Sequence, residues 1–184
     1  MSSSKFGVVT ICFSLLIVGC GTPESSQIDQ LRQQFLVESI GGAPTSLATA
    51  LELEDRQPEL VLAGKIYGGD LSPFDAKKAS FTIVELPEPG HNHDDPGDCV
   101  FCKRKLDEAA MAAVHLVDDQ SATIELPADK LLGLTSKMSV MVKGKTKRVG
   151  DMLIVQATEL CILDDAKAAE LSAAFRQPNP TDTP

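Results

Sequence analysis

The sequence is poor in aromatic side chains and in positive charge. None of its 184 residues is tryptophan, one is tyrosine, and aromatic residues make up 4%. A chain with so few aromatics lacks the stacking surfaces on which single-stranded nucleic acids bind. Lysine and arginine number 17 against 26 acidic residues, so the net charge is −9. Duplex DNA requires a basic face that neutralises phosphates, and we therefore expect no nucleic-acid partner.

The apolar run near the N-terminus is too short to cross a bilayer comfortably, since a spanning helix takes about 20 apolar residues. It extends from Phe6 to Val18 and follows a short polar segment with one positive charge at Lys5. This order is typical of a signal peptide, which we assign to residues 1–19. Apolar residues make up 43% of the chain, which suffices for one domain with a hydrophobic core.

The apolar run ends at Ile17-Val18-Gly19-Cys20. An aliphatic residue three positions before a cysteine, with a small residue directly before it, resembles the lipobox of bacterial lipoproteins. The resemblance implies cleavage before Cys20, diacylglycerol on its sulfur and an acyl chain such as palmitate on its new amino group. Gly21, rather than aspartate, follows the cysteine, which in that family favours the outer membrane. The alternatives are an ordinary secretory signal and a short membrane anchor.

Composition divides the remaining chain into three parts. Residues 20–56 form a lipid-anchored tether and a helical segment, residues 57–163 a β-rich domain, and residues 164–184 a helix and a Pro-rich tail that we expect to be disordered. The expected helices are Gln27–Ile40, Ser46–Leu53, Pro127–Leu134 and Asp164–Phe175, and the expected strands are Glu59–Tyr67, Ala79–Leu86, Met111–Asp118, Met138–Lys145 and Asp151–Leu163.

The order of these strands predicts the fold. Three strands, a short helix and two further strands follow one another, which is the order of an OB-fold, a five-stranded Greek-key barrel. Gly64 inside the first strand indicates a bulge or a sharp bend. We therefore predict a mainly β chain with flanking helices, forming an OB-fold-like five-stranded barrel with a metal-binding loop inserted at residues 87–105. Another small antiparallel barrel or a sandwich is the alternative.

The insert concentrates side chains that bind metals. One residue separates His91 from His93, so an extended chain directs both rings to one side. Cys99 and Cys102 have the Cys-x-x-Cys spacing, which brings two sulfurs together in a tight turn. Two imidazoles and two thiolates suit zinc first and copper(I) second. These four residues are the predicted metal ligands.

Other chemistries are open to the same two cysteines. A Cys99–Cys102 disulfide is favoured by an exported location. A thioredoxin-type pair begins a helix after a strand, whereas these cysteines are expected in a loop. A hydrolase that uses metal-bound water needs an open coordination position, and no activating glutamate is evident nearby. We therefore expect no enzyme, with a thiol oxidoreductase or a metal hydrolase as the enzymatic alternatives.

The insert also carries a resemblance to a second group of proteins. Its His-x-His run, followed by Cys-Val-Phe-Cys-Lys-Arg, stands beside a lipobox and a small β-domain. In this combination the chain resembles uncharacterised lipoproteins of planctomycete-type bacteria. The resemblance implies no activity, and it carries over only a metal-binding role for His91, His93, Cys99 and Cys102.

A basic hairpin is expected in this acidic protein. Lys143, Lys145, Lys147 and Arg148 border the face on which OB-folds usually bind ligands. An alternative function is therefore an OB-type binding module for an anionic oligomer or a protein partner, with the Cys-x-x-Cys pair as a disulfide. A solvated turn is the other interpretation of these charges.

Two further residues are expected to be structural. His115 lies within a strand, and Cys161 lies in an apolar strand as a small buried side chain. Taken together, the sequence predicts a lipid-anchored protein of the cell envelope that faces the periplasm or the exterior. Its expected partners are the membrane, through Cys20, and a zinc or copper(I) ion with a structural or metal-handling role. The sequence does not name a protein partner.

Overall fold

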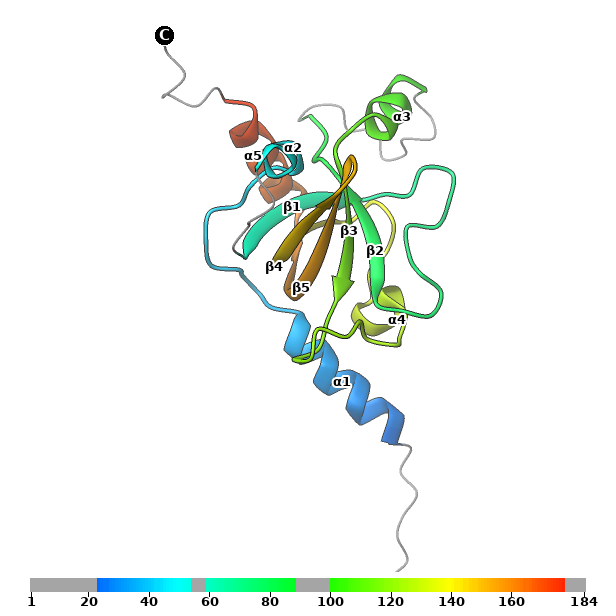
Figure 1. Cartoon of the computed structure of the whole chain (residues 1–184). Coiled ribbons are helices and arrows are strands. Elements are labelled where there is room, and N and C mark those ends of the chain that lie inside the picture. Colours follow the sequence, from blue (N-terminus) through cyan, green and yellow to red (C-terminus); the bar gives the residue numbers. More distant parts are fainter. Residues whose placement is uncertain (1–22, 54–58, 89–99, 178–184) are drawn as a thin grey trace, which may run out of the picture.

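A computed structural model describes residues 23–53, 59–88 and 100–177 of the chain. In order along the chain, the elements are α1 (Pro23–Phe35), α2 (Leu47–Glu52), β1 (Leu60–Ile66), β2 (Ser80–Val84), α3 (Val100–Asp107), β3 (Met111–Leu116), α4 (Ala128–Leu132), β4 (Ser139–Val149), β5 (Met152–Leu163) and α5 (Asp165–Phe175). Figure 1 shows these helices around one sheet. Within the described ranges, no helix has the length and apolar character that crossing a membrane requires.

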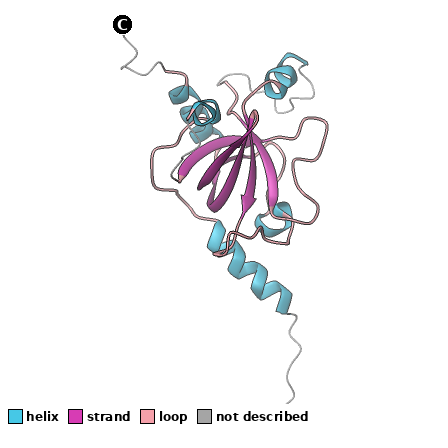
Figure 2. Ribbon diagram, in the orientation of Figure 1, coloured by secondary structure: helices cyan, strands magenta, loops and turns pink. Residues whose placement is uncertain are grey.

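The strands form one closed ring in the order β1-β2-β3-β5-β4, with β4 returning to pair with β1 (Figure 2). Neighbouring strands are antiparallel except β3 and β5, which run parallel. The result is a mixed five-stranded sheet with flanking helices. The predicted mainly β architecture is confirmed, and so is the order of three strands, a short helix and two strands, with α3 as an addition.

Alternation along the strands places the main core inside the ring. In β3 every second residue from Ala112 to Leu116 is buried, and the residues between them are partly exposed. The first half of β5 alternates in the same way. The inward side chains pack with Phe35 of α1, Leu47 of α2 and Leu131 of α4, all fully buried. Burial of large apolar side chains is worth about 1.5–3 kcal/mol each, so this core is the main source of stability.

Two glycines permit close contacts between strands. A β-carbon on Gly144 would overlap the carbonyl oxygen of Gln156, at the point where the register of β4 against β5 shifts. A β-carbon on Gly64 would lie 2.7 Å from the carbonyl oxygen of Val84, where β1 passes β2. The irregularity predicted at Gly64 is thus a close approach of two strands, and the register shift itself is at Gly144.

The first helix ends earlier than its apolar spacing predicts. The sequence predicted a helix at Gln27–Ile40, whereas α1 ends at Phe35. The next residues join the sheet instead: Leu36 forms a parallel bridge with Leu160, and the N–H of Val37 donates to the carbonyl oxygen of Leu160 at 2.9 Å. Pairing with β5 therefore overrides the helical pattern at this point.

The last helix covers part of the outside of the ring. Leu171 of α5 belongs to a second apolar cluster with Val61 of β1 and Met141 of β4. The predicted start of this helix is confirmed, because the Asp164 side chain accepts the N–H of Lys167 at 2.7 Å as an N-cap. The outer face of β1 and of the first half of β4 is therefore covered by α5.

The insert is not irregular throughout. We predicted a loop at residues 87–105, and this is wrong for its last part, because α3 begins at Val100. Arg104 and Lys105 lie in the last turn of α3, where positive charge is favourable near the free carbonyl groups. Arg104 also lies 3.9 Å from the carboxylate of Glu108, one turn on. Residues 89–99 lie outside the described part of the chain.

Candidate metal centre and its attachment to the ring

The structure describes the backbone position of one of the four predicted metal ligands. Cys102 lies in the first turn of α3, whereas His91, His93 and Cys99 lie outside the described residues. The tight turn expected at Cys102 is thus helical. In the ranges that the structure covers, no three histidine, cysteine or acidic side chains are arranged to hold a metal ion. The metal site therefore stays a prediction, and the contacts below describe how the insert is attached at its two ends.

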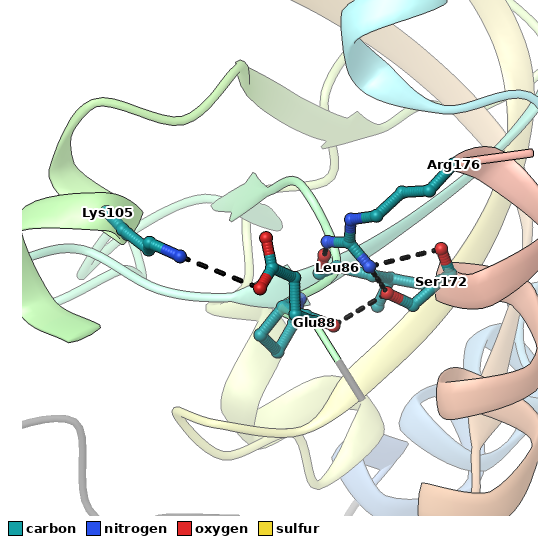
Figure 3. Close-up of polar contacts among 6 residues, drawn as sticks. Leu86, Glu88, Lys105, Ser172 and Arg176 are labelled. Atoms are coloured by element: carbon teal, nitrogen blue, oxygen red, sulfur yellow. Dashed lines mark hydrogen bonds and ion pairs between the residues drawn. The ribbon is translucent and has the colours of Figure 1, made fainter. Parts of the chain in front are cut away.

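Arg176, at the end of α5, holds the chain where the insert begins (Figure 3). Its Nη2 donates to the carbonyl oxygen of Leu86 at 2.9 Å, and its Nη1 donates to both oxygens of Ser172. The buried hydroxyl of Ser172 donates to the carbonyl oxygen of Pro87 at 2.6 Å. Two consecutive carbonyl groups are satisfied in this way, which fixes the direction in which the chain leaves β2.

Lys105 joins the two ends of the insert. Its Nζ lies 3.6 Å from Oε2 of Glu88, and Figure 3 shows the two side chains pointing toward each other. Both side chains are largely exposed, so the ion pair adds little to stability. The ion pair has a larger geometric consequence. It holds α3, at the end of the insert, beside Glu88, the last described residue at the start of the insert.

Tyr67 holds the far end of α3. Its hydroxyl donates to Oδ1 of Asp107, the last residue of α3, at 3.0 Å. Burial, the hydrogen bond and charge of Asp107, and the charge of Asp70 together raise the pKa of Tyr67 to about 12. The phenol therefore keeps its proton, and with it the hydrogen bond, at neutral pH.

Glu85 links the end of β2 to α2. Its Oε2 accepts the N–H of Ala48 at 2.9 Å, and its own N–H donates to the carbonyl oxygen of Ala110 at 3.0 Å. Burial raises the pKa of the Glu85 carboxyl, although hydrogen bonds from the N–H groups of Ala48 and Leu47 and the charge of Arg176 oppose the rise. The residue just before the insert is thus held to α2, and through Ala110 to the chain that follows α3.

These anchoring residues were missed in the sequence. The partners Tyr67 and Asp107 are 40 residues apart, and Arg176 and Leu86 are 90 residues apart. Local periodicity carries no signal for contacts at that separation. The weak signals available were the single tyrosine at the end of the first strand and an arginine at the end of the last helix.

Cys161 is buried, as expected, in the second apolar cluster, which also contains Leu86 directly before the insert. It is 6% exposed, and its Sγ donates to the carbonyl oxygen of Glu38 at 3.2 Å. Burial raises the pKa of its thiol, so the reactive thiolate is disfavoured. The thiol therefore behaves as a small buried side chain whose polar contacts are the backbone carbonyl groups of Glu38 and Ile162.

The predicted basic hairpin does not act as one basic patch. Nζ of Lys143 lies 2.9 Å from Glu159 and 3.5 Å from Glu59. The hydrogen bond and charge of Glu159, followed by the charge of Glu59, raise the pKa of Lys143. The charge of this lysine is thus balanced by two local carboxylates.

Arg148 also has structural partners. Its Nε donates to the carbonyl oxygen of Gly150 at 2.9 Å, and its Nη1 donates to that of Leu51 at 3.0 Å. Leu51 lies near the end of α2, where a positive charge is favourable. Lys145 and Lys147 are exposed, and within the described residues neither forms an ion pair with a carboxylate. Of the four predicted residues, these two remain available for a partner.

The insert and the N-terminal helix lie at opposite ends of the ring. Figure 1 shows α1 projecting from one end and α3 lying beyond the other. Nε of Arg32 in α1 donates to the carbonyl oxygen of Leu131 in α4 at 2.9 Å, which holds α1 against the ring. Because α1 begins at Pro23, just after Cys20 in the sequence, the end nearest the predicted lipid is the end farthest from α3.

No family model matches the chain. Ornithine aminotransferase 1 from Staphylococcus saprophyticus subsp. saprophyticus is 28% identical over 130 residues. The match covers 66% of this chain and 32% of that protein, so the chain spans about a third of the length of this curated relative. Identity and coverage at this level establish neither a family nor an enzymatic activity for the chain.

Proposed function

We propose that the protein is a lipid-anchored protein of the cell envelope that binds a transition metal ion, zinc or copper(I). The proposed ligands are His91, His93, Cys99 and Cys102. Two thiolates balance the charge of Zn²⁺, and two imidazoles complete a four-coordinate set of the kind that structural zinc sites use. Metal bound by such a set contributes directly to folding stability, since the unfolded chain lacks the arranged ligands.

One observation carries this proposal: the insert leaves and returns to the ring at one place. Glu88 and Lys105 form an ion pair across its two ends. Arg176 and Tyr67 tie the flanking residues to α5 and to the end of β1. The four proposed ligands all lie between these anchored ends, within residues 91–102. Short units that bury little apolar surface are commonly held by a metal ion or a disulfide, and this ligand set supports the metal ion.

We include an OB-fold-like five-stranded barrel in the proposal as the platform for the insert. The strand order β1-β2-β3-β5-β4, the parallel pairing of β3 with β5, and α4 between β3 and β4 support it. Closure of the ring removes open sheet edges, which suits a small domain on a cell surface.

The lipid anchor at Cys20 is the second part of the proposal. With α1 at one end of the ring and α3 at the other, an anchored chain presents the insert away from the membrane (Figure 1). The test is expression of the full chain and of its Cys20→Ser variant in bacteria. We expect the chain in the membrane fraction, with a mass raised by lipid, and the variant without the lipid mass. A chain whose mass equals that of its amino-acid sequence without lipid would refute the anchor.

The metal is tested by elemental mass spectrometry of the full chain, purified in detergent without an affinity-tag metal. We expect about one zinc or copper ion per chain, lost in the Cys99→Ser/Cys102→Ser and the His91→Ala/His93→Ala variants. Matched controls are Cys161→Ala and His115→Ala, because both residues lie in strands outside the insert. Both controls are expected to keep the metal.

Thiol titration of the same samples separates the alternatives. A chain without metal whose mass is lower by two hydrogens contains a Cys99–Cys102 disulfide, and this result would overturn the metal site. Where metal is found, exchange with a chelator over minutes indicates metal handling, and retention over days indicates a structural clamp. Cys161 serves as an internal reference, since its buried thiol is expected to react only after unfolding.

A further inference from the structure

On part of the outer surface of the ring, the side chains pack against neither of the two apolar clusters. The outward positions of β2, β3, the first half of β5 and the second half of β4 alternate with the buried core residues of these strands. None of these outward residues belongs to either apolar cluster. The uncovered residues are Ser80, Thr82, Met111, Ala113, His115, Lys145, Lys147, Val149, Met152, Ile154 and Gln156, and we refer to them as the outer face.

The register of the strands aligns the outer face in rows. Ser80 pairs with His115, His115 with Gln156, and Gln156 with Lys145. Partner residues on neighbouring strands point to the same side, so these four side chains form one polar row across four strands. Burial and the charge of Lys78 lower the pKa of His115, which leaves a neutral ring in this row.

The second row mixes charge with apolar side chains. Thr82 pairs with Ala113, Ala113 with Ile154, and Ile154 with Lys147. The row therefore places a lysine at one end and a methyl-bearing side chain on each of the other three strands.

The third row is apolar. Val84 of β2 begins this row and is fully buried, and it pairs with Met111. Met111 pairs with Met152, and Met152 pairs with Val149 across the hairpin. Met152 is 38% exposed and Val149 is 54% exposed. Methionine side chains adapt to partners of varied shape, and exposed apolar groups in one cluster mark interaction sites.

The charge of the outer face is opposite to that of the chain. The chain carries 26 acidic residues against 17 basic ones, yet none of the outer-face residues is acidic. Its two lysines, Lys145 and Lys147, have no carboxylate partner among the described residues, whereas the neighbouring Lys143 has two. Lys145 and Lys147 thus place positive charge without an ion-pair partner at outward positions beside the apolar row.

We propose that the outer face binds an acidic, partly apolar peptide segment of a partner protein. Carboxylates of the segment pair with Lys145 and Lys147, and its apolar side chains contact Met111, Met152 and Val149. Four strands span about 14 Å between the outermost ones, and three rows extend about 13 Å along them. This area fits an extended segment of about four or five residues.

The combination of rows selects a peptide over a uniform polyanion. A polyphosphate or nucleic acid satisfies the lysines but leaves the methionine row without a partner. A long polyanion is also repelled by the chain as a whole, whose net charge is −9. A peptide that carries both carboxylates and apolar side chains satisfies both rows within the area of the face.

The inference goes beyond metal binding, since it uses none of the predicted ligands. The probe is a fluorescent synthetic peptide of alternating glutamate and valine, titrated with the full chain in detergent and followed by fluorescence anisotropy. We expect saturable binding that weakens as salt is raised. The Lys145→Glu/Lys147→Glu variant is expected to lose about tenfold or more in affinity, because attraction becomes repulsion at both positions.

The matched control reverses two exposed lysines elsewhere, Lys130 in α4 and Lys167 in α5. Lys130→Glu/Lys167→Glu changes the net charge of the chain by the same amount, and it is expected to keep nearly full affinity. Circular dichroism of both variants checks that they are folded. Equal losses in the two variants, no saturable binding of the peptide, or equal binding of polyphosphate would each overturn the proposal.

Discussion

The hydrogen bond between Tyr67 and Asp107 offers a direct measurement of how the insert is attached. Tyr67 is the single tyrosine of the chain, and the sequence has no tryptophan. The absorbance change on phenol ionisation therefore reports this one residue. The perturbation is Asp107→Asn, which removes the charge of the acceptor while keeping an oxygen near the hydroxyl.

The expected size follows from the causes of the shift. Burial contributes most to the rise of the Tyr67 pKa to about 12, and Asp107 contributes next through its hydrogen bond and its charge. Because the phenol is partly exposed, solvent screens the Asp107 contribution. We expect Asp107→Asn to lower the pKa by about one unit, and to leave it above the usual value of about 10. Asp70→Asn, which removes only a more distant charge, is the matched control.

The sign of the effect on stability follows from the same shift. The folded pKa lies above the unfolded one, so the stability that this group contributes is present at neutral pH. It is lost as the pH rises through about 12. The assay is absorbance titration with far-ultraviolet circular dichroism recorded alongside, so that only folded samples are read. A normal pKa in the unchanged chain, or the same pKa in Asp107→Asn, would refute the reasoning.

Three further predictions concern the ring and its contacts. Gly144→Ala places a β-carbon against the carbonyl oxygen of Gln156. It is expected to lower the free energy of unfolding by about 3 kcal/mol or more in urea titrations. Gly133→Ala, where a β-carbon meets no neighbouring atom, is expected to lower it less. Glu85→Gln removes a half-buried carboxyl whose pKa is raised. The stability that comes from this shift is present below about pH 4.5 and is lost as the pH rises through the folded pKa. The variant should therefore lose less stability than the unchanged chain on going from about pH 4 to about pH 7 in thermal unfolding, and an identical pH profile would contradict this. Arg176→Ala removes the donors to Leu86 and Ser172 and should lower stability by about 1–2 kcal/mol, with Arg104→Ala on α3 as the comparison.

The fold followed from local patterns in the sequence. Runs of β-forming apolar residues located all five strands, and Asp164 located the start of α5. Boundaries failed where distant pairing took over. Leu36 leaves the helix to pair with Leu160, and β4 extends to Val149 because its partner β5 continues to the hairpin turn. Leu160 lies too far from Leu36 in the sequence to appear in a periodic window, whereas Val149 and Met152 pair directly across the hairpin turn.

The attachment of the candidate site shows a sharper limit. The sequence located a segment dense in metal ligands, yet it gave no sign of the contacts that hold the segment. Arg176 donates to carbonyl groups, which every residue carries, so no sequence pattern marks its partner. The prediction missed α3 because it continued the expected loop through residue 105. The helical spacing of Arg104 and Glu108 was the available signal for this helix.

The positions of the basic residues connect the attachment of the insert with the outer face. An acidic chain gains stability wherever a lysine or arginine finds a carboxylate or a free carbonyl group, and Lys143, Arg148 and Arg176 all do so. Lys145 and Lys147 lie on the same strand as Lys143, but the register places Gln156 and Ile154 opposite them instead of acids. Within the described residues, the fold therefore provides no ion-pair partner for these two charges. A role in binding accounts for positive charge at outward positions that folding does not use, and reversal of these two lysines measures that role while leaving the anchors of the insert in place.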